Sequence, residues 1–121
     1  MEDKKCIFCK IVKGKVKGEK VRESDNFFAF LDANPKVEGH TLVVPKKHFV
    51  TLLDIPDKLG EEMLNFIKKV SSDILEKKKG DGFNIVMNNL KCAGQVVTHA
   101  HIHIIPRKEG DGMENGVNLN I

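Results

Sequence analysis

This sequence of 121 residues contains no tryptophan and no tyrosine, so its seven phenylalanines are its only large aromatic side chains. It also lacks any apolar run near the roughly 20 residues that a membrane-spanning helix needs. Its first six residues, MEDKKC, contain no apolar signal segment. We therefore expect an intracellular, cytoplasmic protein with no membrane association.

The charge is nearly balanced. Twenty Lys and Arg against 17 Asp and Glu give a net charge of +3, and the basic residues are interspersed rather than gathered in a dense stripe. Duplex DNA requires such a stripe, so we expect no DNA partner. A mild basic bias suits an anionic small molecule. The length fits one domain over residues 1–121, of which 109–121 would be a short tail.

Cysteine is scarce and its count is odd. Cys6 and Cys9 form a C-x-x-C pair, and Cys92 stands alone. In an intracellular protein such a pair is more often a metal or redox site than a disulfide. Two reduced thiols without a ligand are the plain alternative. A redox pair is less favoured because no thioredoxin-like strand–helix–strand pattern follows it.

The apolar pattern predicts an α+β fold. A short helix is expected over residues 6–13, ended by Gly14, and a long one from the start signals Asp54 and Pro56 to Gly80. Strands are expected over residues 27–31, 40–44, 82–88 and 99–105, the last ended by Pro106. Because strands and helices alternate too sparsely for a doubly wound fold, we expect an antiparallel sheet. Of Phe27 and Phe28, which are adjacent on a strand, one is expected to face inward and the other outward.

Three of the five histidines fall in the run His99-Ala-His101-Ile-His103-Ile-Ile. On a strand, alternate residues share a face, so the three imidazoles would line one side. A polar strand face or an adventitious metal chelate is the plain alternative. A neutral imidazole with a pKa near about 6.5 is, however, a competent nucleophile toward phosphorus. The preceding Gly94-Gln95-Val96-Val97 turn and Asn88 could cradle a phosphate.

The run resembles the histidine-triad (HIT) motif, His-φ-His-φ-His-φ-φ with φ apolar. Three further segments match that family in the right order: Cys6-Ile-Phe-Cys9, the segment from Phe28 to Pro35, and the segment from Gly39 to His48. The resemblance is nearest to histidine-triad nucleotide-binding proteins of the bacterial-type form with a zinc-binding C-x-x-C. It implies a HIT-like antiparallel sheet of about five strands with one short N-terminal and one long central helix, and a homodimer.

The resemblance also implies a function. A purine nucleotide such as AMP or GMP would bind, and His101 would attack the α-phosphorus to form a nucleotidyl-histidine that water hydrolyses. His103 would contact the phosphate or the leaving group, and His40 would support the cluster. The other implied substrate contacts are Ile7, Phe8, Phe30 and Leu42 for the base, Asp32 for the ribose, and Asn88, Gln95, Val96 and Val97 for the phosphate.

Zinc is the cofactor that this resemblance implies. Two thiolates and two imidazoles complete a tetrahedral site, and His48 and His99 are the candidates to join Cys6 and Cys9. All four positions would then be filled by protein, so the metal would be structural. One departure from the family concerns Val96, where related chains often carry a hydroxyl; we expect altered handling of the leaving group.

Three functions stay open at this stage. The first is a nucleoside phosphoramidase, which cleaves AMP from an amine. The second is a dinucleoside polyphosphate hydrolase with the same nucleophile. The third, of another class, is a nucleotide-binding adaptor with little turnover. A phosphotransfer domain is weaker, because that role needs one exposed histidine on a helical bundle.

Overall fold

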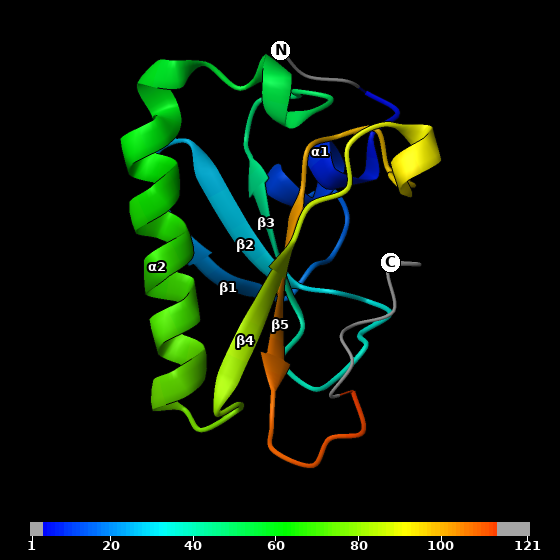
Figure 1. Cartoon of the computed structure of the whole chain (residues 1–121). Coiled ribbons are helices and arrows are strands. Elements are labelled where there is room, and N and C mark those ends of the chain that lie inside the picture. Colours follow the sequence, from blue (N-terminus) through cyan, green and yellow to red (C-terminus); the bar gives the residue numbers. More distant parts are fainter. Residues whose placement is uncertain (1–3, 114–121) are drawn as a thin grey trace.

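In the computed structural model, which describes residues 4–113, the chain forms one five-stranded antiparallel sheet with the strand order β1-β2-β3-β5-β4. The strands are β1 (Lys20–Glu23), β2 (Phe27–Leu31), β3 (Thr41–Pro45), β4 (Gly82–Val86) and β5 (Ile102–Arg107). The helices are α1 (Ile7–Val12) and α2 (Gly60–Glu76), with short 3₁₀ turns at Leu52–Asp54, Asp57–Leu59 and Lys91–Ala93. The expected α+β class, sheet and two helices are confirmed (Figure 1).

The long helix covers one face of the sheet (Figure 1). Its buried residues include Phe66, Val70 and Ile74, which recur every four positions and therefore form one stripe along the helix. This stripe packs against Phe27 of β2 and Ile104 of β5. The helix begins at Gly60, later than the start signals at Asp54 and Pro56 predicted. The residues before it form the two 3₁₀ turns Leu52–Asp54 and Asp57–Leu59 instead.

A second core lies on the opposite face of the sheet, beneath α1. Phe8 of α1 packs there with Phe28 and Phe30 of β2 and Leu42 of β3. Phe8 and Phe30 meet edge to face, with their ring centroids 5.5 Å apart. Because both faces are covered, Phe27 and Phe28 are both buried, and the expectation that one faces outward is wrong.

The last strand differs from its expected bounds. β5 begins at Ile102 rather than at His99, and it runs through Pro106, which pairs with Phe83 of β4. The neighbouring strand β3 pairs no further along β5 than Ile104. Pro106 therefore lies where β5 has a ladder partner on one side only, a position that tolerates the missing amide proton.

No helix within the described residues is long and apolar enough to cross a membrane. Of the expected tail over residues 109–121, only 109–113 are described. In this part, Asp111 accepts hydrogen bonds from Arg107. The guanidinium lowers the pKa of Asp111 below its ordinary value. Residues 1–3 and 114–121 lie outside the described part.

Candidate functional site

A cleft of about 730 Å³ opens on the α1 side of the sheet. The residues that the sequence analysis placed in the substrate site and that line this cleft are Ile7, Phe8, Phe30, Asp32, Leu42, Val96, Val97, His101 and His103. His40, Asn88 and Gln95 are buried and do not line it. Three charged residues that were not predicted from the sequence also border the cleft: Lys17, Glu19 and Lys36. Their positions follow from loop geometry, for which the sequence offered no motif.

His101 has a defined tautomer. Its Nδ1 lies 2.7 Å from the main-chain oxygen of His99. A carbonyl oxygen can only accept, so Nδ1 carries the proton and Nε2 carries the lone pair. Burial lowers the pKa of His101 below its ordinary value, which keeps the ring neutral at pH 7. The ring therefore presents an unprotonated nitrogen at a residue that lines the cleft.

His103 and His40 form a buried pair behind the cleft. Nε2 of His40 lies 2.9 Å from Nδ1 of His103, while Nδ1 of His40 accepts the main-chain N–H of Lys36 at 3.0 Å. Nε2 of His103 is buried and has no hydrogen-bond partner among the described residues. Burial lowers the pKa of His103 to about 3 and also lowers that of His40, so both rings are neutral at pH 7.

Asp32 lies at the end of β2, beside this pair. Its Oδ1 accepts the main-chain N–H of Asn34 at 2.9 Å, and its Oδ2 lies 3.5 Å from Nε2 of His40. The donor atoms of Asp32, His40 and His103 are close enough to share a metal ion. However, a metal on Nε2 of His40 would require the proton to move to Nδ1, where the Lys36 amide already donates. The trio therefore fits a hydrogen-bonded cluster better than a metal site.

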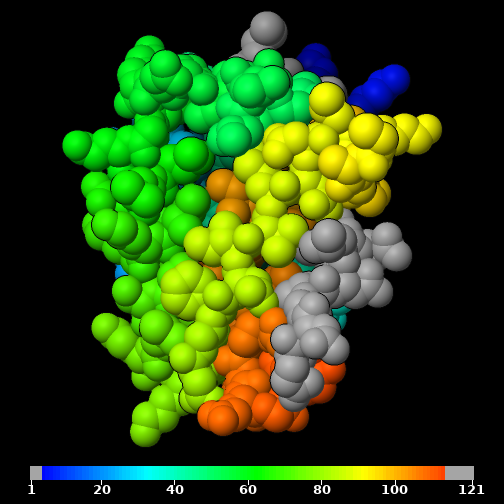
Figure 2. All heavy atoms as spheres, in the orientation of Figure 1, coloured from blue at the N-terminus to red at the C-terminus, as the bar shows by residue number. Residues whose placement is uncertain are grey.

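Gln95 holds a loop together instead of facing the cleft. Its Nε2 donates to the main-chain oxygens of Val50 and Val97 at 2.6 and 3.1 Å, and its Oε1 accepts the N–H of Leu90 at 2.7 Å. The segments around residues 50 and 90 lie side by side, in blue-green and yellow in Figure 2. The Asn88 side chain donates to the main-chain oxygen of Gly94 in the same loop. Both amides therefore shape the loop that carries Val96 and Val97 to the cleft.

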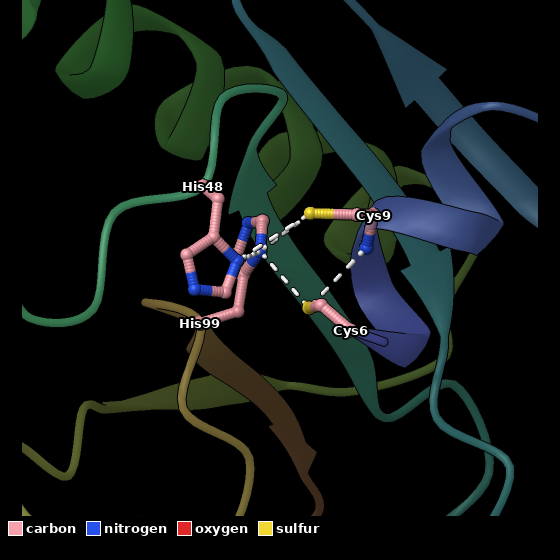
Figure 3. Close-up of side chains that lie close together, drawn as sticks. All are labelled: Cys6, Cys9, His48 and His99. Atoms are coloured by element: carbon pink, nitrogen blue, oxygen red, sulfur yellow. Dashed lines mark hydrogen bonds between the residues drawn. The ribbon is translucent and has the colours of Figure 1, made fainter. Parts of the chain in front are cut away.

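Cys6, Cys9, His48 and His99 converge at one point (Figure 3). Nδ1 of His99 lies 3.4 Å from Sγ of Cys6, 3.5 Å from Sγ of Cys9 and 3.2 Å from Nδ1 of His48. Sγ of Cys9 lies 3.4 Å from Nδ1 of His48. All four residues were predicted from the sequence, and the structure brings them together from the N-cap and first turn of α1, from the segment after β3 and from the segment before β5.

These separations fit a tetrahedral zinc site. With Zn–S near about 2.3 Å and Zn–N near about 2.05 Å, a tetrahedron places S and N about 3.6 Å apart and two N atoms about 3.3 Å apart. Nε2 of His99 lies 2.8 Å from the carbonyl oxygen of Pro45, so it carries the proton and leaves Nδ1 to face the thiols. Burial lowers the pKa of His99 to about 4, which keeps the ring neutral, as a ligand must be.

Comparisons with known proteins show which proteins this chain is similar to. The uncharacterized HIT-like protein MJ0866 of Methanocaldococcus jannaschii is 52% identical over 109 residues, covering 88% of this chain and 82% of that protein. Adenosine 5'-monophosphoramidase HNT1 of Candida albicans is 40% identical over 108 residues, which cover 86% of this chain and 71% of that protein. A Zn-bound histidine triad family protein from Mycobacterium smegmatis has a similar structure, with a TM-score of 0.84 and 36% identity over 94% of this chain and 83% of that one.

The family model of the HIT domain matches residues 13–110, which include all three histidines of the triad and the cleft-lining residues other than those of α1. The sequence resemblance, the matched fold and this model agree, and the chain belongs to the HIT domain family.

Proposed function

We propose that this protein is a nucleotide hydrolase that cleaves the bond between the α-phosphate of a purine nucleotide and an amine. The tautomer of His101 carries this proposal. Its Nδ1 proton is donated to the His99 carbonyl, so Nε2 carries the lone pair. The ring lines a cleft whose volume suits a nucleotide. The relative named as an adenosine 5'-monophosphoramidase supports the same substrate class.

Two displacements at phosphorus complete the reaction. Nε2 of His101 attacks the α-phosphorus, the N–P bond to histidine forms, and the P–N bond to the amine breaks. The amine leaves with that electron pair and takes a proton from solvent. Water then attacks phosphorus and gives a proton to solvent, the bond between phosphorus and Nε2 breaks with its electron pair returning to Nε2, and the nucleoside monophosphate is released. The Nε2–H of His103 donates to a phosphate oxygen during both steps, and His40 holds His103 from behind.

The walls of the cleft suggest how the nucleotide lies. Ile7, Phe8, Phe30 and Leu42 form its apolar part and would hold the base. Without tryptophan or tyrosine this slot is loose, so we expect little discrimination between adenine and guanine. Asp32 would accept the ribose hydroxyls. The main-chain amides of Val96 and Val97 would meet the phosphate, and Asn88 and Gln95 would support them by shaping their loop.

Zinc is the metal we propose for Cys6, Cys9, His48 and His99. With four protein ligands the ion has no open position, so when bound it supplies a structural link and no Lewis-acid chemistry. The link joins α1, which carries Phe8 of the base slot, to the segment that carries His101. The metal would therefore keep two walls of the cleft in register.

A second copy of the chain is the protein partner we propose. β4 is an edge strand, and Phe83 and Ile85 on it are 38% and 50% exposed. Ile85 pairs with Ile104, whose side chain packs under α2, so these two residues face the α2 side. An edge strand with an apolar face invites pairing with another copy.

Rapid-quench mass spectrometry after mixing with an adenosine phosphoramidate tests the function. We expect an adenylyl adduct on the peptide that contains His101, and none in His101→Ala. Faster turnover of diadenosine polyphosphates than of the phosphoramidate would favour a dinucleoside polyphosphate hydrolase. Tight AMP binding with no adduct and no turnover would point to an adaptor and overturn the proposal.

A further inference from the structure

The loop from Asp32 to His40 is closed by its own hydrogen bonds. The N–H of Asp32 donates to the His40 carbonyl at 2.9 Å, and the N–H of His40 donates to the Val37 carbonyl at 3.1 Å. Within this frame the N–H of Lys36 points at the ring of His40 and donates to Nδ1 at 3.0 Å. A main-chain amide at pH 7 always donates, so Nδ1 of His40 must always accept.

The donating amide of Lys36 fixes the tautomer of His40, and His40 in turn fixes the tautomer of His103. Since Nδ1 of His40 accepts, its single proton sits on Nε2, 2.9 Å from Nδ1 of His103. Nδ1 of His103 must then accept as well, and the proton of that ring sits on Nε2. Nε2 of His103 is the atom with no partner among residues 4–113, although the residue is only 3% exposed and lines the cleft. A buried donor without a partner points to a ligand atom.

The same chain of bonds also prevents proton transfer. If His103 released its Nε2 proton, the proton on Nε2 of His40 would have to follow it onto Nδ1 of His103. His40 would then be left as an imidazolate, because the amide of Lys36 cannot surrender its own proton. Among residues 4–113, Oδ2 of Asp32 also lies near Nε2 of His40, at 3.5 Å, and as a hydrogen-bond acceptor it brings no further proton to this chain of bonds.

We propose that the main-chain N–H of Lys36 and the ring of His40 are positioning elements that lock His103 as a permanent Nε2–H donor to the phosphate and bar it from acting as the acid for the leaving group. This inference rests on the function proposed above and names a role for an amide that no side-chain motif would disclose. The ligand it serves is an anionic oxygen, here the non-bridging oxygen of the α-phosphate.

The decisive comparison changes one N–H group. Lys36→Ala keeps the amide, whereas the same chain with lactic acid at position 36, introduced as an α-hydroxy acid, replaces it with an ester oxygen. Long-range ¹H–¹⁵N NMR then reports the tautomers of His40 and His103. We expect Nε2–H on both rings in the native chain and in Lys36→Ala. In the ester chain we expect a population with the proton on Nδ1 of each ring, and kcat lower by about tenfold than in Lys36→Ala.

Two results would overturn the inference: an Nδ1–H tautomer of His103 in the native chain, or identical tautomers and kcat in the alanine and ester chains. The NMR spectrum of the native chain requires no variant. It therefore tests the tautomer of His103 even if the ester chain folds poorly. Failure of the proposed function is distinguishable, because it would abolish the adenylyl adduct in the native chain without altering these tautomers. A leaving-group dependence of kcat that disappears in His103→Gln would also contradict the inference, since it would show His103 acting as the acid.

Discussion

The main-chain carbonyl of His99 accepts the Nδ1 proton of His101 at 2.7 Å, while the ring of His99 faces the thiols of Cys6 and Cys9. One residue thus belongs to the proposed zinc site through its side chain and to the candidate nucleophile through its backbone. The position of the candidate nucleophile therefore depends on a cluster whose members come from three segments that are far apart in the sequence.

Removal of zinc should destabilise the protein and disturb the nucleophile together. A metal present at about 1,000 times its Kd stabilises the folded state by about 4 kcal/mol. We expect Cys9→Ser to lose zinc, as read by elemental analysis, and to lower the free energy of unfolding by a comparable amount in urea titrations. Cys92→Ser is the matched control, because Cys92 is exposed and outside the cluster. Equal zinc content in the native protein, Cys9→Ser and Cys92→Ser would contradict the proposed zinc site.

Acid should weaken the fold through His103. Burial lowers the pKa of His103 to about 3 in the folded protein, against about 6.5 in an unfolded chain. Between these values the unfolded chain binds more protons, so stability is fully present above pH 6.5 and declines as the pH falls toward 3. Denaturant titrations at pH 7 and pH 5 should show a smaller loss in His103→Asn, which does not titrate. A parallel loss in both proteins would refute this assignment.

Substitution of Gln95 should affect stability more than nucleotide contact. Gln95→Ala removes three hydrogen bonds to the main chain of Val50, Leu90 and Val97. We expect a loss of about 2–3 kcal/mol of unfolding free energy. Gln95→Glu keeps the acceptor for Leu90 and should fall in between. A variant of native stability that binds AMP much more weakly would instead favour direct contact with the phosphate.

The edge strand should carry the contact between copies. Ile85→Lys places a charge in the exposed apolar face of β4 and should shift the protein from dimer to monomer in sedimentation velocity. Leu53→Lys is the matched control, because Leu53 is 90% exposed but lies in the turn before α2. A native protein that sediments as a monomer at micromolar concentration would rule out the dimer.

Local pattern was enough for the main elements of the fold. The apolar pattern between Pro56 and Gly80 predicted the long helix, whose buried stripe carries Phe66, Val70 and Ile74, and the alternation from His99 to Ile105 predicted which side chains share a face. β1 was not predicted, since Lys20–Glu23 is a short, charged edge strand without an apolar alternation, although its partner β2 is the next strand in the chain. The path of β5 through Pro106 depends on where the antiparallel strand β3 begins, and local sequence pattern does not contain that information.

The parts of the site that depend on the chemical type of a side chain could be predicted from the sequence. The four proposed zinc ligands and the cleft position of His101 and His103 follow from residue identity and family resemblance. The role of Gln95 as a loop anchor and of the Lys36 amide as a donor could not be predicted, because both depend on main-chain atoms that lie close together only after folding.

The alternation of histidines and isoleucines along β5 also fixes the register in which β5 pairs with β3. Leu42 pairs with His103 and Val43 with Ile102 in the ladder between β3 and β5. A slip of one residue would turn the imidazoles toward α2 and the isoleucines toward the cleft. Such a chain would lose its core packing and would also move His99 away from Cys6, Cys9 and His48, so a misregistered molecule would lose the core and the proposed metal site together.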